Sequence, residues 1–335
     1  MRLVLVLAST LLAAPDGGVS VTDVRVLPAT GLKLPGAPGR IGMDYLAYDP
    51  QTHQVWVPAS NTGRTMVIDS STRKISTVDG FPTVTKDNRT SGPTSATIGE
   101  GFVYVGNRAD SSICPVEKKS LKLGSCLKLD STPDGIAYVA TTKEVWVTTP
   151  RDKSLRVLDA SGPNLSAKAV LPVDGQPEGY AVDPGRGVFY TNLEDKDVTL
   201  AIDVRTRKIN ATYHPKCGAA GPRGLSIDLD KQLLFVACTD HGATLALKAG
   251  GKLVAEAQTG GGVDNPDYLP SRKLLYLASG KTATLHIFQV SEDGGLKPIA
   301  TAPTANGARV VVVDGKGTAF VADSAGGQLV VVDAP

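Results

Sequence analysis

The chain has 335 residues with 35 basic and 33 acidic side chains, so its formal net charge at neutral pH is +2. Such a balanced chain lacks the positive field with which proteins bind nucleic acids or anionic membranes, and both classes of partner are excluded. Its 36 glycines and 22 prolines indicate a fold with many tight turns.

The first 18 residues have the pattern of an export signal. Arg2 provides the positive start, and the apolar run at 3–12 is too short to span a bilayer. Small residues follow, so we expect cleavage at or before Gly18; the alternative is a buried N-terminal strand. No later run of 18 apolar residues exists, and we therefore predict a periplasmic or secreted protein without a membrane span.

A pattern of four short strands recurs through the rest of the chain. It is clearest where apolar alternation and Asp, Pro and Gly turns predict strands at 179–183, 187–191, 198–204 and near 209–213. One aromatic residue marks the second strand of each unit. These residues are Trp56, Tyr104, Trp146, Phe189, Phe235, Tyr276 and Phe320. Repeats of about 40–50 residues predict an all-β fold, a seven-bladed β-propeller with four-stranded antiparallel blades.

The units form a single domain over residues 19–335. Blade one is expected at 43–80, blade two at 93–129, and the others begin at 134, 178, 223, near 264 and at 309. Residues 81–92 are an insertion that we expect to be an exposed loop. The last unit has three strands, so we predict that the N-terminal strand Val19–Val26 completes the last blade and closes the ring.

Four cysteines remain in a chain that is expected to be exported, and three pairings are possible. Cys114 and Cys126 fall on neighbouring strands about a polar turn centred on Ser120, which would place them opposite each other. Cys217 precedes blade five and Cys238 ends its second strand, on the same face. We therefore predict the disulfides Cys114–Cys126 and Cys217–Cys238. Four unpaired thiols are the alternative, and would suit a cytosolic chain better.

Polar residues recur at two positions of the unit that face one mouth of the central channel. The innermost strands begin near Asp44, Thr94, Asp134, Glu178, Arg223, Asp264 and Arg309. The loops after the second strands add Asn61, Asn107, Asn192, Glu194, Asp240 and His241. Converging carboxylates raise one another's proton affinity unless a cation or an arginine compensates, and carboxylates with amides suit Ca²⁺.

Two interpretations of this mouth stay open. In one, a divalent cation binds to the set Asp44, Asp134, Glu178, Asn192 and Asp264. In the other, Arg223 and Arg309 pair with the acids and satisfy the channel's polar groups. A ligand would then contact Asn61, Asn107, Arg223, Asp240, His241 and Arg309. His241 alone among the histidines is expected on this side, and a solvated loop residue is its alternative role.

The units VWVPASNTGRTMVID, VYVGNRADSSI and FYTNLEDKDVTLAID resemble the YVTN-type repeats of exported bacterial propellers. The likeness covers nearly the whole mature chain; it is specific for fold and weak for function, because such proteins range from binding scaffolds to enzymes. The chain is more distantly similar to the gluconolactonase and senescence-marker-protein group, hydrolases with a central divalent cation held by Glu, Asn and Asp. That resemblance implies Glu178, Asn192 and Asp264 as ligands, although no contiguous motif of the group is present.

Three functions follow from these patterns. The first is a non-catalytic exported propeller, expected to be a monomer, that binds a small molecule or a protein at its channel face. The second is a metal-dependent lactone or ester hydrolase, in which the cation activates water or polarises a carbonyl. The third, a pyrroloquinoline-quinone dehydrogenase, is disfavoured because such propellers usually carry Trp-rich repeats and this chain has two tryptophans.

Overall fold

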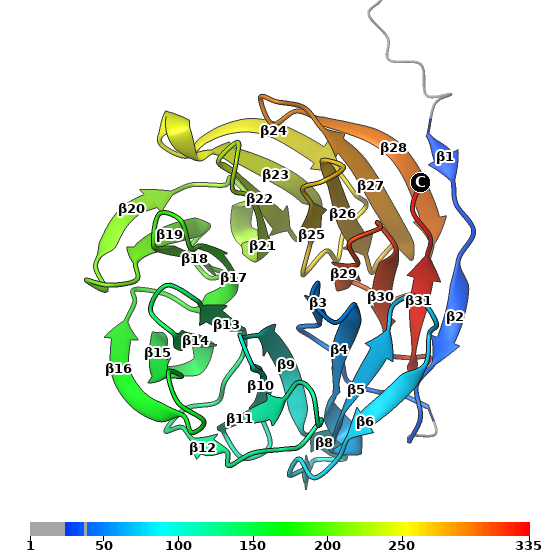
Figure 1. The fold of residues 1–335 in the computed structure, drawn as a ribbon. Coiled ribbons are helices and arrows are strands. Elements are labelled where there is room, and N and C mark those ends of the chain that lie inside the picture. The colour runs from blue at the N-terminus through cyan, green and yellow to red at the C-terminus, as the bar shows by residue number, and fades with distance from the viewer. Residues whose placement is uncertain (1–23, 37–38) are drawn as a thin grey trace, which may run out of the picture.

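The chain folds into seven blades around a central axis, each built on a four-stranded antiparallel sheet, and one of these sheets gains a fifth strand in parallel (Figure 1). The structure is a computed structural model that describes residues 24–36 and 39–335, so the expected export signal lies outside the described residues. It confirms the predicted all-β, seven-bladed propeller with four-stranded antiparallel blades.

The first four blades follow one another along the chain. Blade one contains β3 (Ala47–Asp49), β4 (Gln54–Ala59), β5 (Arg64–Asp69) and β6 (Ile75–Val78). Blade two contains β9 (Pro93–Ile98), β10 (Phe102–Asn107), β11 (Ser112–Glu117) and β12 (Leu127–Lys128). Blade three contains β13 (Ile136–Val139), β14 (Glu144–Thr149), β15 (Ser154–Asp159) and β16 (Ser166–Pro172). Blade four contains β17 (Pro177–Asp183), β18 (Val188–Leu193), β19 (Val198–Asp203) and β20 (Ile209–Tyr213).

The remaining blades take in the N-terminal segment. Blade five contains β21 (Pro222–Asp228), β22 (Leu233–Cys238), β23 (His241–Ala246) and β24 (Lys252–Gln258). Blade six contains β25 (Asp267–Leu269), β26 (Leu274–Ser279), β27 (Thr284–Val290), β28 (Leu296–Pro303) and the added β1 (Arg25–Val26). Blade seven contains β29 (Val311–Val313), β30 (Ala319–Asp323), β31 (Gln328–Val332) and β2 (Thr30–Lys33). Short 3-10 helices follow in some connections: η2 (Ser60–Thr62), η3 (Pro150–Asp152), η4 (Gly218–Ala220) and η5 (Leu247–Ala249).

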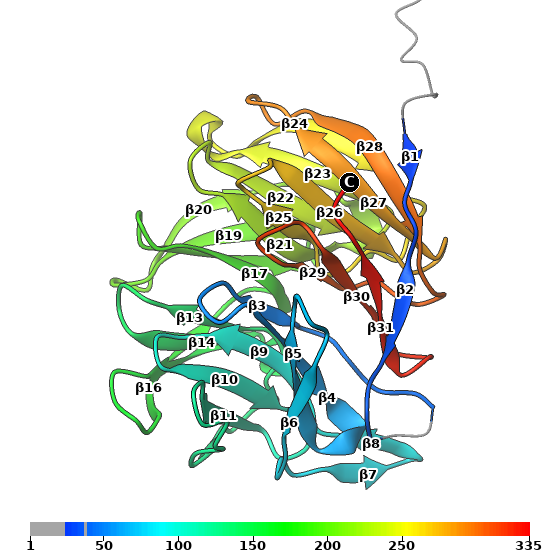
Figure 2. The same ribbon diagram turned by 45° about the vertical axis from the view of Figure 1, so that its right-hand side comes forward.

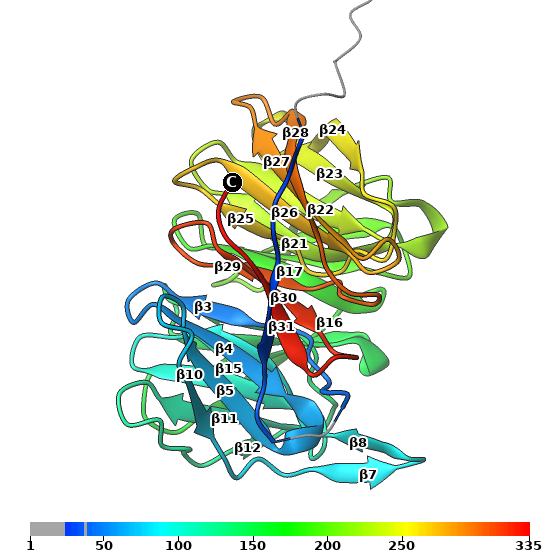
Figure 3. The same ribbon diagram turned by 90° about the vertical axis from the view of Figure 1, so that its right-hand side faces the viewer.

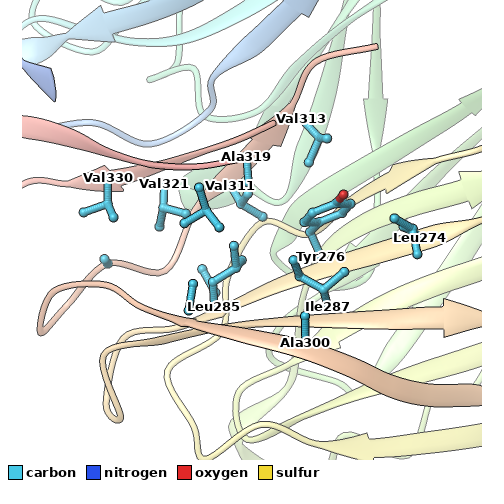
Figure 4. Packing of buried hydrophobic residues seen from close by; sticks show 14 of the residues in the cluster. Leu274, Tyr276, Leu285, Ile287, Ala300, Val311, Val313, Ala319, Val321 and Val330 are labelled. Carbon is cyan, nitrogen blue, oxygen red and sulfur yellow. The ribbon is translucent and has the colours of Figure 1, made fainter. Parts of the chain in front are cut away.

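The hydrophobic core is divided into seven clusters, one between each pair of neighbouring blades. Figure 4 shows the cluster between blades six and seven, where Tyr276 and Ile287 meet Val311 and Val313. In each blade the aromatic residue of the second strand faces the following blade, as Trp56 does in packing with Val103 and Val105. Burial of these side chains is therefore what joins each blade to the next.

Blade four departs from the predicted register by one residue. Strand pairing places Tyr190 opposite Ala181, in the position that Trp56 occupies opposite Ala47 in blade one. Phe189 points to the other side of the sheet, where its ring lies 4.9 Å from that of Trp146 in blade three. Both positions of this blade are aromatic, and the sequence pattern alone selected the wrong one of the two.

The ring is closed by the N-terminal segment, but by residues further along the chain than predicted. Strand β2 pairs antiparallel with β31 and becomes the outer strand of blade seven. The expected strand was Val19–Val26, of which residues 19–23 lie outside the described residues. Its last two residues, Arg25 and Val26, form β1, which pairs parallel with β28 of blade six. Figures 2 and 3 show β1 and β2 running as one segment past both blades.

Two features of the connections complete the fold. The structure contains the disulfides Cys114–Cys126 and Cys217–Cys238, which are the pairings predicted from the repeat.

The insertion at 81–92, predicted as a loop, instead contains the two-stranded hairpin β7 (Val84–Lys86) and β8 (Arg89–Ser91). This hairpin projects beyond blade one (Figure 3). Within the described residues, no helix has the length and apolar content needed to cross a bilayer.

Candidate functional site at the channel mouth

The innermost strands contact one another where they begin, and this fixes the residues of one channel mouth. Tyr45 donates its backbone N–H to the carbonyl of Thr94 at 3.0 Å, and Gly224 donates to the carbonyl of Asp264 at 3.0 Å. Only glycine fits at position 179, because a Cβ there would lie 2.3 Å from the carbonyl oxygen of Arg223. Each side chain at the mouth therefore starts from a backbone held by the neighbouring blade.

Arginines pair with most of the acids that the sequence places at the mouth. Arg108 Nη2 lies 2.7 Å from Asp44 Oδ2 and also contacts Asp134, so it bridges blades one and three. Arg309 Nε lies 3.0 Å from Asp264 Oδ2. These contacts match the interpretation in which arginines pair with the acids of the mouth. Arg108 is a third arginine, which the sequence analysis did not select.

The remaining pair involves an acid that was not assigned to the cation. Arg223 contacts Glu194, which follows β18 in blade four. The predicted ligand residue Arg223 is thus at the mouth, and its nearest carboxylate comes from a loop after a second strand.

Two carboxyl groups of the mouth hold their protons more tightly than usual. Burial raises the pKa of Glu178 to about 7, and the negative charges of Asp264 and Asp44 act in the same direction. Burial also raises the pKa of Asp264 to about 6, although the guanidinium of Arg309 opposes the shift. Near neutral pH the mouth is therefore less negative than its count of acids suggests.

The three asparagines at the ends of second strands bind backbone groups. Asn61 accepts from Gly42 N at 3.0 Å and donates to the carbonyl of Arg40. Asn107 donates to the carbonyl of Pro82 at 3.0 Å and accepts from the backbone N–H of Ala109. Asparagine at this position of the repeat therefore ties an incoming segment to its blade.

Asn192 is fully buried, as Asn107 is. Its Nδ2 donates to the carbonyl of Arg223 at 2.5 Å, and its Oδ1 accepts from the hydroxyl of Thr199 at 2.6 Å. Both ends of the amide are engaged, and neither points to the channel as a free ligand. Asn192 thus links blade four to the start of blade five.

The five residues predicted as cation ligands do not form a ligand set that fits the ion. Within residues 24–36 and 39–335 no group of three or more His, Cys, Asp or Glu side chains is arranged to hold a metal. Arg108 and Arg309 occupy positions beside Asp44, Asp134 and Asp264 where a cation would be repelled. The amide of Asn192 is bound to the carbonyl of Arg223 and the hydroxyl of Thr199.

Two tyrosines lie across the channel below the mouth. The rings of Tyr45 in blade one and Tyr180 in blade four stack with centroids 5.8 Å apart and planes inclined by 21°. Gly135 makes room for this stack, because a Cβ there would lie 2.8 Å from the Tyr180 ring. Beyond the tyrosines a mostly apolar cavity of about 430 Å³ continues toward the other end of the channel. Tyr45 and Tyr180 both line this cavity.

Two adjoining cavities occupy the mouth itself. The first, of about 450 Å³, is lined by Asp44, Arg108 and Arg309. The second, of about 740 Å³, extends outward to Arg89 on the β7–β8 hairpin, and both share Arg40 and Arg108 in their walls. Together they form a concave polar site that we call the arginine cleft, lined by Arg40, Arg89, Arg108 and Arg309.

Sequence reasoning selected part of this cleft. Arg309, Asp44 and Asn61 line it as expected. Arg108 directly follows Asn107, which stands at the repeat position after a second strand. This place in the repeat is the signal that could have identified Arg108. Arg40 comes just before blade one, and no feature of the repeat points to it.

Asp240 and His241 lie apart from the cleft. His241 is buried at the start of β23, with Nδ1 2.6 Å from Asp240 Oδ1 and Nε2 3.4 Å from Glu256 Oε1. Neither residue lines the two cavities of the mouth. Of the residues predicted to contact a ligand, the structure therefore brings Arg309 and Asn61 to the cleft, whereas Arg223, Asn107, Asp240 and His241 do not line it.

Fold and site together define a seven-bladed β-propeller with a polar cleft at one channel mouth. No protein-family description and no curated protein matches the sequence. Solved structures match it over nearly its full length: a chain of a mitotic checkpoint complex at 14% identity, covering 99% of each chain, with a TM-score of 0.76.

Two bacterial structures are similar to the same extent. Virginiamycin B lyase from Staphylococcus aureus is 13% identical, covering 92% of this chain and 99% of its own, with a TM-score of 0.72. A chain of Kuenenia stuttgartiensis hydrazine synthase is 16% identical over 95% and 99%, also with a TM-score of 0.72. At such identities the likeness shows the propeller fold alone.

We expect Asn192→Ala to lower the free energy of unfolding by about 2 kcal/mol or more, because the buried Arg223 carbonyl and Thr199 hydroxyl lose their partner. Denaturant unfolding measures the change. Asn164→Ala, at an exposed bend between β15 and β16, is the matched control and should leave stability within about 0.5 kcal/mol. Equal stability of the two variants would contradict the structural role of Asn192.

We expect the substitution Glu178→Gln to stabilise the fold, relative to the parent, more at pH 8 than at pH 5. The pKa of Glu178 is about 7 in the folded chain against an ordinary 4.5, so the folded state binds more protons between these values. Its carboxyl therefore costs stability as the pH rises through this window, and glutamine removes that cost.

Denaturant midpoints of the parent and Glu178→Gln at pH 5 and pH 8 measure this difference. Glu100→Gln, at an exposed turn, serves as the control and should show the parent's pH dependence. Asp264, whose pKa is also raised, should leave a smaller slope of the same sign in Glu178→Gln. A variant that loses stability equally at both pH values would show that Glu178 is charged in the folded chain at pH 5.

Proposed function

We propose that the chain is an exported β-propeller that binds a small molecule in the arginine cleft, without catalysing its conversion. The observation that carries the proposal is the pair of adjoining cavities around Arg108. Concave sites of several hundred Å³ with a few convergent polar groups are typical of small-molecule binding. The alternative of a metal-dependent hydrolase has no support from the arrangement of the acids, which face arginines.

Cavity filling tests this binding site. We expect ligands found in a thermal-shift screen of neutral sugars, organic anions and organic cations to lose their effect in Ala325→Trp, because Ala325 is exposed in the wall of the first cavity. Ala249→Trp, exposed on the connection between β23 and β24, is the matched control and should bind as the parent does. A ligand that still binds to Ala325→Trp, or a screen without any ligand, would reject the proposal.

Export is supported by two observations. The pattern of residues 1–18 is that of a leader, and both disulfides are of a kind that persists in oxidising compartments. We expect the protein recovered from the periplasm or the culture medium to begin after a cut at or before residue 18. N-terminal sequencing of that fraction measures the cut. An intact Met1 on protein found only inside the cell would contradict export.

A further inference from the structure

We propose that the ligand of the arginine cleft is a small hydroxylated molecule that carries at least two anionic groups, carboxylate or phosphate. This inference rests on the proposed function and names the chemistry of the same site. It starts from the charges in the cavity walls: four arginines, Arg40, Arg89, Arg108 and Arg309, against the single acid Asp44.

The two inner arginines are held in place with donors to spare. Among the described residues, Arg108 uses Nη2 for its ion pairs and Arg309 uses Nε, which leaves the other nitrogens of each guanidinium without a protein acceptor. Their side chains remain 34% and 57% exposed, and both line the first cavity of the cleft. A guanidinium fixed on one edge presents its second edge for paired hydrogen bonds to a carboxylate or phosphate.

The two outer arginines have no acid beside them. In the part of the chain that the structure describes, Arg40 and Arg89 make no ion pair, and both are exposed in the wall of the second cavity. They come from different segments, one before blade one and one on the β7–β8 hairpin. A second anionic group on the ligand would match the positive charges of these two arginines.

Neutral polar groups fill the spaces between the arginines. Asn306 and Ser324 line the inner cavity, while Asn88, Thr90 and Ser91 line the outer one. Amides and hydroxyls both donate and accept, which suits the hydroxyl groups of a polyol chain. The cavities, of about 450 and 740 Å³, accommodate a molecule the size of a sugar diacid and no folded partner.

Calorimetric titration tests the proposal with glucarate, citrate and pyrophosphate as probes and sorbitol as the neutral control. We expect one or more of the three anions to bind and sorbitol not to bind; comparing the carboxylates with pyrophosphate distinguishes the two sources of charge. Arg40→Gln and Arg89→Gln should each weaken binding by about tenfold or more, and raising the salt concentration should weaken it further. Both residues are exposed, so the variants are expected to fold as the parent does.

Arg205→Gln, in the exposed turn between β19 and β20, is the matched control and should leave the affinity unchanged. Anion binding that is the same in Arg40→Gln, Arg89→Gln and the parent would overturn the inference. So would a neutral ligand that binds while all three anions fail; if Ala325→Trp blocks that ligand, the proposed function stands and only the anion class is wrong. If no compound binds at all, both proposals fail together.

Discussion

Contact between neighbouring blades is the constraint on which the rest of the structure depends. Each sheet buries one face against the preceding blade and the other against the following one, so no blade has a core of its own. The aromatic residue of each second strand fills the space toward the next blade. Seven such contacts are satisfied together only when the ring is closed, which explains why β2 returns to blade seven.

Closure also determines which residues meet at the axis. The innermost strands begin side by side, and so residues that are more than forty positions apart become neighbours, as Asp44 and Arg108 do. Burial there raises the proton affinity of Glu178 and Asp264, and arginines balance the acids that stay charged. The cleft extends to Arg40 and Arg89, which belong to segments outside the repeat and have no acid beside them to balance their charge.

The repeat allowed the fold to be predicted and left the site only partly defined. Strand spacing and aromatic positions were enough for seven blades and for the cysteine pairings, since these depend on register. The mistakes have local causes: Phe189 and Tyr190 are both aromatic, and the two N-terminal strands are both short, with two residues in β1 and four in β2. Sequence could not tell whether Asp44 faces a cation or Arg108, because that depends on side-chain positions from three blades. Nor could it show that the amide of Asn192 is engaged by the carbonyl of Arg223 and the hydroxyl of Thr199.

The Tyr45–Tyr180 stack has a consequence for exchange. The stacked rings lie between the innermost strands of blades one and four, and they line the cavity behind the mouth but neither cavity of the mouth itself. The proposed ligand would therefore exchange through the outer opening of the cleft, which Arg89 of the β7–β8 hairpin lines. The position of this hairpin would then affect the residence time of the ligand as well as its rate of arrival.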